Sequence, residues 1–158
     1  MKNRFFLQLL AVSMVLIGFT ACKKDKEPAN EISDSTGLKT SLNWSLNGGG
    51  TALGTDIDME LYKGTGATKV STGISASSST AFESFVMPAS LEDGDYTIEV
   101  DYYDLSDAGK MNFTFQGNSN ANLTYEIKDI AFALSENFDT KDVIRINKSG
   151  NKFTITKL

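Results

Sequence analysis

The sequence predicts an all-β fold, a two-sheet antiparallel sandwich of the immunoglobulin-like or jelly-roll kind with about eight or nine strands. From Leu38 onward, apolar residues recur with a period of two, which is typical of half-buried strands. No long segment of residues 38–158 has the period of an amphipathic helix. Loops rich in Gly, Ser and Asn separate the short apolar segments, as in small β-sandwiches.

The first half of this region contains four expected strands. They cover residues 38–46, 56–62, a short segment near 70, and 82–87. Runs rich in glycine or serine follow the first three, at residues 47–50, 63–66 and 75–79, and Pro88 follows the fourth. Trp44 is in phase with Leu42 and Leu46, so we expect it in the core rather than on a binding surface.

The second half begins with the strongest strand pattern of the chain. The expected strands are residues 95–103, 111–115, 123–127, 143–146 and 153–155, the last two joined as a hairpin across 148–151. The apolar phase slips by one residue between Ile127 and Ile130. Such a slip indicates a β-bulge near Lys128 or Asp129.

The first residues have the features of an export leader. A short basic head is followed by an apolar run at residues 5–19, which is shorter than the ~20 residues that a membrane-spanning helix needs. The run ends at Ala21-Cys22, before the charged residues 23–27. This pattern resembles the lipobox of bacterial lipoproteins, with Phe19 at a position that is usually aliphatic. The alternative is an ordinary signal peptide with a chance cysteine.

The lipobox resemblance implies cleavage before Cys22 and lipidation of its thiol, which would anchor the chain in the bacterial outer membrane, on its periplasmic or its surface face. Two or three acyl chains make such an anchor durable. We therefore expect a signal peptide at residues 1–21, an acylated flexible tether at 22–37, and the β-sandwich at 38–158.

Composition excludes several kinds of active site. The chain has no histidine, and Cys22 is its one cysteine, so Cys/His zinc sites, Ser-His-Asp triads, Cys-His pairs and disulfides are absent. Loss of Lys2 and Arg4 with the leader changes the formal net charge from −5 to −7, which disfavours nucleic acid as a partner. No catalytic constellation remains, and we expect a protein that is not an enzyme.

A short acidic motif precedes the strongest strand. Asp93-Gly94-Asp95-Tyr96 has the form of a tyrosine corner, in which a tyrosine hydroxyl bonds to nearby backbone in Greek-key sandwiches. Together with Leu42-x-Trp44, residues 56–62 and Phe113-x-Phe115, this order resembles the pre-peptidase C-terminal domain. The resemblance covers about residues 38–116 and implies a small β-sandwich with an accessory binding or targeting role. An extra residue in the Asp-x-Asp segment and further strands after 122 depart from that family.

Acidic residues gather on two of the expected strands. Asp56 and Asp58 share the polar face of residues 56–62, whereas Asp101 and Asp104 lie at the end of the strongest strand. If these strands are neighbours, Asp56 or Asp58 meets Asp101 across the pair. Carboxylate oxygens suit Ca²⁺, so these four aspartates are candidate calcium ligands, and no other cofactor is expected. The alternative is a solvated polar face, since the EF-hand spacing is absent.

Two tyrosines are out of phase with the apolar faces of their strands. Tyr62 and Tyr103 are therefore candidates for stacking on sugar rings, with ordinary strand propensity as the alternative. The expected function is that of a non-catalytic envelope or cell-surface lipoprotein, whose sandwich binds an extracellular glycan or protein. The alternative is a structural envelope lipoprotein that packs as a subunit within a larger membrane-associated complex.

Overall fold

The computed structural model describes residues 30–48 and 54–158, and these form an all-β, two-sheet antiparallel sandwich, as predicted. The strands are β1 (Glu31–Ser33), β2 (Gly37–Leu46), β3 (Asp56–Lys63), β4 (Val70–Ala76), β5 (Phe82–Pro88), β6 (Gly94–Asp104), β7 (Gly109–Gly117), β8 (Thr124–Phe132), β9 (Thr140–Ser149) and β10 (Lys152–Lys157). The expected signal peptide, Cys22 and the start of the tether lie outside the described residues.

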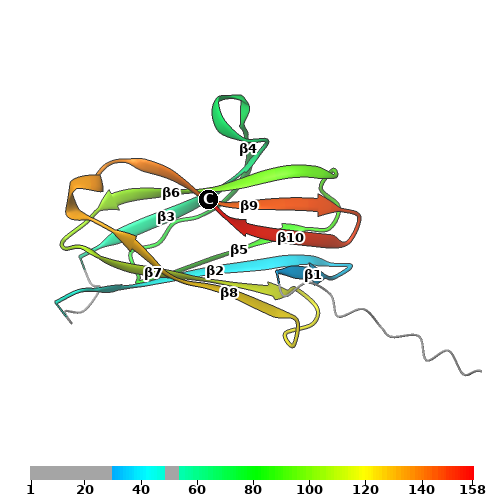
Figure 1. Ribbon diagram of the computed structural model, residues 1–158, viewed down its shortest axis with the longest axis horizontal. Helices are drawn as coiled ribbons and strands as arrows, with labels where there is room; N and C mark the ends of the chain where they lie inside the picture. The colour runs from blue at the N-terminus through cyan, green and yellow to red at the C-terminus, as the bar shows by residue number, and fades with distance from the viewer. Residues whose placement is uncertain (1–29, 49–53) are drawn as a thin grey trace, which may run out of the picture.

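The two sheets form the two layers seen in Figure 1. One has six strands in the order β1-β10-β9-β6-β3-β4, and the other has four in the order β5-β2-β7-β8. Two single 3-10 turns, η1 (Gly66–Thr68) and η2 (Leu134–Glu136), are the helical elements of the described residues. No helix within residues 30–48 and 54–158 has both the length and the apolar character needed to cross a membrane.

The core lies between the sheets and follows the predicted alternation. Successive side chains of a strand point to opposite faces, so the apolar set of most strands faces the other sheet, whereas the projecting strand β4 has no buried residue. The largest fully buried side chains include Tyr96, Tyr102, Phe113, Phe115 and Phe153. Trp44 is 5% exposed and belongs to this core, which confirms its predicted place.

The sandwich contains one strand more than the upper number expected, because it begins before Leu38. β1 pairs with β10 through Glu31, Ile32 and Ser33, and Ile32 is buried in the core. Residues 31–37, which the low apolar content assigned to the tether, therefore belong to the folded domain. A three-residue strand with one apolar side chain has too short a pattern to be detected as a period of two.

Two local predictions are confirmed in detail. The Tyr96 hydroxyl donates a hydrogen bond of 2.7 Å to the Glu92 carbonyl, which is the tyrosine corner. In the β7–β8 pair, Phe113 lies opposite Ile127 and Met111 lies opposite Ile130, so two residues of β8 face Asn112 alone. This is the predicted bulge, with Asp129 at a φ of 57°.

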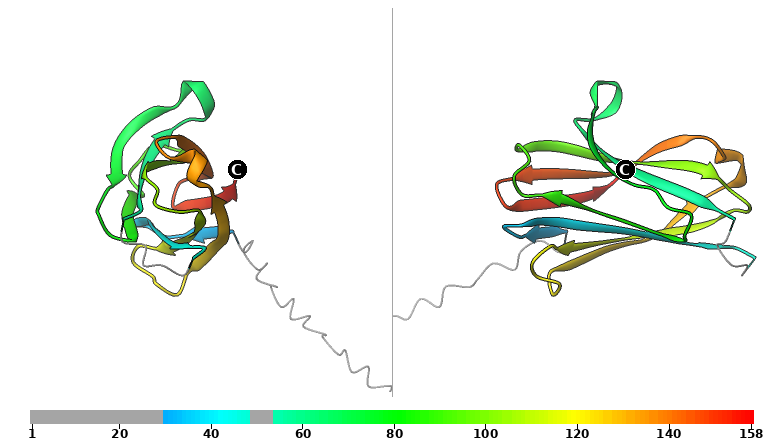
Figure 2. Two further views of the ribbon diagram at one scale, coloured as in Figure 1. Left: turned by 90° about the vertical axis from the view of Figure 1, so that its left-hand side faces the viewer. Right: turned by 180° about the vertical axis from the view of Figure 1, so that it is seen from behind.

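The β3–β4 hairpin projects from the edge of the six-stranded sheet, as Figure 2 shows in both views. Gly64 and Gly66 have φ values of 92° and 56°, which a side chain would strain, and they allow the chain to turn back through η1. The hairpin is tied to β6, since Thr97 donates a hydrogen bond of 2.7 Å to the Gly64 carbonyl. Residues after the turn therefore reach over the outer face of β3 and β6.

Candidate functional site

The outer face of the six-stranded sheet has an open polar hollow of about 310 Å³. Strands β3, β4, β6 and β9 contribute to it, together with the first residue of the β4–β5 connection. Its lining residues are Asp58, Met59, Glu60, Tyr62, Ser75, Ala76, Ser77, Glu99, Asp101 and Thr140. Three of the residues singled out from the sequence, Asp58, Tyr62 and Asp101, therefore lie in one hollow.

Asp58 and Asp101 are cross-strand partners, as predicted for neighbouring strands. They lie opposite each other in the antiparallel β3–β6 pair, and Thr140 of β9 is the next partner of Asp101. Asp58 Oδ1 is buried and has no hydrogen-bond partner within the described residues. No ion pair joins either carboxylate to a lysine or arginine of the described chain.

The electrostatics of this pair favour protonation. Burial, followed by the nearby charges of Asp56, Glu83 and Asp101, raises the pKa of Asp58 to about 6. Burial and the charges of Glu99 and Asp56 also raise the pKa of Asp101. Like charges directly opposite each other on a sheet are destabilising, so the two carboxylates repel each other when both are charged, and no ion pair within the described residues offsets this.

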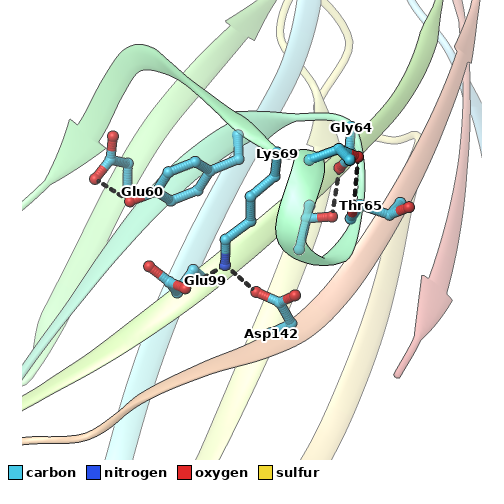
Figure 3. A network of polar contacts seen from close by, with 9 residues as sticks. Glu60, Gly64, Thr65, Lys69, Glu99 and Asp142 are labelled. Atoms are coloured by element: carbon cyan, nitrogen blue, oxygen red, sulfur yellow. Dashed lines mark hydrogen bonds and ion pairs between the residues drawn. The ribbon is translucent and has the colours of Figure 1, made fainter.

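A lysine neutralises the neighbouring carboxylates of the same face (Figure 3). Lys69 follows the η1 turn and forms an ion pair with Glu99 of β6. Its Nζ also lies 2.5 Å from Oδ1 of Asp142 in β9. Burial works against the charged ammonium, but its hydrogen bonds to Asp142 and Glu99 outweigh this and raise the pKa of Lys69. Lys69 was not recognised in the sequence, because the hairpin geometry that brings it over β6 leaves no short-range pattern.

Tyr62 is less available for stacking than its alternation suggested. The Lys69 ammonium lies over the Tyr62 ring, 4.7 Å from its centroid, in a cation–π contact. A sugar ring therefore cannot stack on this face of Tyr62 while Lys69 is there. The Tyr62 hydroxyl donates a hydrogen bond of 3.0 Å to Glu60 Oε2. Burial and this bond raise the pKa of Tyr62. Tyr62 therefore helps to form the wall of the hollow and to hold Lys69.

The other three predicted residues line a second, separate hollow. Asp56, Tyr103 and Asp104 lie around a depression of about 210 Å³ at the end of the β3–β6 pair, where Asp56 is the partner of Asp104. Tyr103 is 60% exposed and is the more accessible of the two predicted tyrosines. Thr55, Ser79 and Gly54 complete this depression.

The structure thus divides the four candidate calcium ligands into two cross-strand pairs. Within the part of the chain that the structure describes, no three acidic side chains come together in a way that could hold a metal ion. Ca²⁺ takes six to eight oxygen ligands and is usually held by several carboxylates at once. Each pair of aspartates alone supplies fewer ligands than Ca²⁺ usually takes, and the calcium site stays a prediction.

One acidic residue of this region was missed. Glu83 of β5 is 3% exposed, and its Oε1 has no hydrogen-bond partner within the described residues. It occupies the inward phase of β5 with Phe85 and Met87, and its charge contributes to the raised pKa of Asp58. A glutamate in phase with apolar strand residues is a signal that the sequence does contain, since unpaired buried charges are costly.

Comparison of the chain with protein-family models, with curated proteins and with solved structures finds no match. The all-β sandwich is therefore defined by its own strands, and its function is inferred from the residues of its surface.

Proposed function

We propose that this chain is a non-catalytic envelope or cell-surface lipoprotein, tethered through Cys22, whose β-sandwich binds an extracellular glycan in the hollow of β3, β4, β6 and β9. One observation carries the binding role. The hollow combines two carboxylates that have no ion pair within the described residues, Asp58 and Asp101, with the hydroxyl-bearing residues Ser75, Ser77 and Thr140. Carboxylates and hydroxyls are the groups that bind sugar hydroxyls through hydrogen bonds.

The proposed anchor fits the direction in which the chain enters the fold. β1 lies at one end of the sandwich, and η2, in the β8–β9 connection, lies at the opposite end (Figure 1). A tether before residue 30 would therefore attach at the β1 end and leave the sheet faces accessible. The lipobox-like residues around Cys22 support this anchor.

The binding role is tested with the mature chain, residues 22–158, carrying Cys22→Ser to prevent lipidation. Titration of soluble polysaccharides into isotope-labelled protein should shift the backbone amide signals of β3, β4 and β6 around the hollow. The signals of β7 and β8 on the other sheet serve as the internal control. Absence of shifts with every polysaccharide would contradict the glycan-binding proposal.

The proposed anchor is tested separately in cells. The full chain should incorporate a labelled fatty acid and fractionate with membranes, whereas Cys22→Ser should lose the label. A wild-type chain without label would contradict the lipoprotein proposal and leave the binding proposal standing.

The second candidate is a structural subunit of a larger envelope complex. Leu134 and Phe138 in the β8–β9 connection are 52% and 75% exposed, and exposed apolar side chains are common at protein contacts. Phe138 also has a φ of 67°, a strained backbone conformation for a bulky residue. If Phe138→Ser abolishes an envelope cross-link that Asp58→Asn leaves intact, this second function is favoured.

A further inference from the structure

We infer that the hollow selects a glycan with a free primary amine, whose ammonium group binds between the facing carboxylates of Asp58 and Asp101. This inference rests on the proposed glycan-binding function and specifies the ligand class, a deacetylated amino sugar. Such a group would supply the positive charge that the described chain does not place at this pair.

The neighbouring row of the same sheet already holds an ammonium in this way. Glu99 of β6 and Asp142 of β9 are cross-strand partners, and Lys69 lies between their carboxylates with its ammonium over the Tyr62 ring (Figure 3). Two residues further along β6, Asp101 faces Asp58 in the same outward orientation. The second pair also offers two carboxylates, and no lysine or arginine of the described residues forms an ion pair with it.

A buried carboxylate provides a second reason to expect a cationic ligand. Glu83 of β5 does not line the hollow, but it is 3% exposed, its Oε1 has no hydrogen-bond partner within the described residues, and its charge acts on Asp58. Burial is the main cause of the raised pKa of Asp58, and the charges of Asp56, Glu83 and Asp101 add to it. Negative charge with low solvent access attracts a cation more strongly than surface carboxylates do.

The geometry favours an ammonium group over a metal ion. The described residues contain no group of three acidic side chains arranged for a metal, whereas an ammonium needs only a few separate acceptors for its three N–H donors. Ser75, Ser77 and Thr140 line the same hollow and provide hydroxyl partners for a sugar ring. A lysine side chain of a protein partner would offer the same ammonium without those ring hydroxyls.

The test compares two probes that differ only at the amine. Glucosamine hexamer and N-acetylglucosamine hexamer are titrated calorimetrically into the mature chain with Cys22→Ser, at low salt and at pH 6.5, where both Asp58 and the sugar amine are substantially charged. We expect the glucosamine hexamer to bind at least about tenfold more tightly than the acetylated one. Asp58→Asn and Asp101→Asn should each remove about tenfold of that affinity.

The control is Glu126→Gln, which removes one negative charge from β8 on the other sheet and should leave the affinity unchanged. Loss of affinity in Asp58→Asn cannot reflect unfolding, because removal of this repulsive charge should raise the unfolding temperature, which is measured on the same samples.

Three outcomes would overturn the inference. Equal binding of the two hexamers would refute amine selection and leave the glycan-binding function intact. Tight binding of a lysine-rich peptide with no binding of either hexamer would replace the amino sugar with a protein partner. Binding of glucosamine hexamer that is unchanged in Asp58→Asn and Asp101→Asn would place the cation elsewhere.

Discussion

Asp58 and Asp101 face each other across the β3–β6 pair, and neither has an ion pair with the described chain. Under the proposed function, this repulsion would make the hollow a site where stability and ligand binding oppose each other. Natural binding sites often keep such unfavourable arrangements, since the ligand compensates for them.

Asp58→Asn should stabilise the unliganded protein at pH 8 by about 1 kcal/mol, which raises the unfolding temperature by several degrees. The folded-state pKa of Asp58 is raised to about 6, above its ordinary value of 3.8, so the wild-type protein loses stability as the pH rises through 6. The advantage of the variant should therefore be full above pH 7 and vanish below pH 4. Thermal unfolding across this range measures it, and an advantage that does not depend on pH would contradict the explanation.

Lys69→Met should destabilise the protein by about 2 kcal/mol, because it leaves the partly buried carboxylates of Glu99 and Asp142 without their cation. Denaturant unfolding at pH 7 measures the loss. The matched control is Lys110→Met, which removes an exposed lysine paired with the exposed Asp129 and should change stability by less than about 0.5 kcal/mol. Equal effects of the two substitutions would show that burial of the Lys69 pair contributes nothing.

The alternation of apolar residues was enough to predict the sandwich, because side chains that face between two sheets must be apolar at every second position. It also predicted that Trp44 is buried and where the β8 bulge lies. The pairing of Asp58 with Asp101 followed only once β3 and β6 were assumed to be neighbours. Contacts that depend on chain reversal, such as Lys69 over Tyr62, have no local signature and needed the folded hairpin.

The sequence pattern was least informative at the start of the domain. Residues 31–37 contain Ile32 as their one large apolar side chain, so composition alone suggested a tether. These residues are held in the folded domain by pairing with β10 and by the hydrogen bonds of Asp34. Such long-range polar contacts cannot be read from hydrophobic periodicity.

Tyr96→Phe should destabilise the protein by about 1 to 2 kcal/mol, since it removes the hydrogen bond to the Glu92 carbonyl while the core packing of the ring is kept. Tyr125→Phe is the control, because the half-buried Tyr125 ring stacks on Phe115 and its hydroxyl makes no hydrogen bond within the described residues. Urea unfolding of both variants distinguishes them. If Tyr96→Phe behaves like Tyr125→Phe, the tyrosine corner does not contribute to stability.

Asp34 links the segment between β1 and β2 to the loop between β7 and β8. Its carboxylate is buried and accepts five hydrogen bonds, from the backbone and hydroxyl of Thr36, the backbone and hydroxyl of Ser119, and the backbone of Asn120. Burial favours the neutral acid, but the hydrogen bonds from Thr36 and Ser119 outweigh it and hold the pKa of Asp34 far below its usual range.

Asp34→Asn should therefore destabilise the protein by about 3 kcal/mol at pH 7, because an amide replaces one acceptor oxygen with a donor that faces the N–H groups of this loop. A lowered pKa gives stability that is present above the ordinary value near 4 and is lost as the pH falls toward the folded-state pKa. The difference between variant and wild type should thus shrink below pH 4, which denaturant unfolding at pH 7 and pH 3 measures.

Gly117→Ala should have a similar effect at pH 7, since its Cβ would lie 2.8 Å from Asp34 Oδ2 and 2.9 Å from the Asn120 carbonyl. Because this steric effect does not depend on protonation, its persistence at pH 3 would separate loss of the charged hydrogen bonds from disruption of the loop.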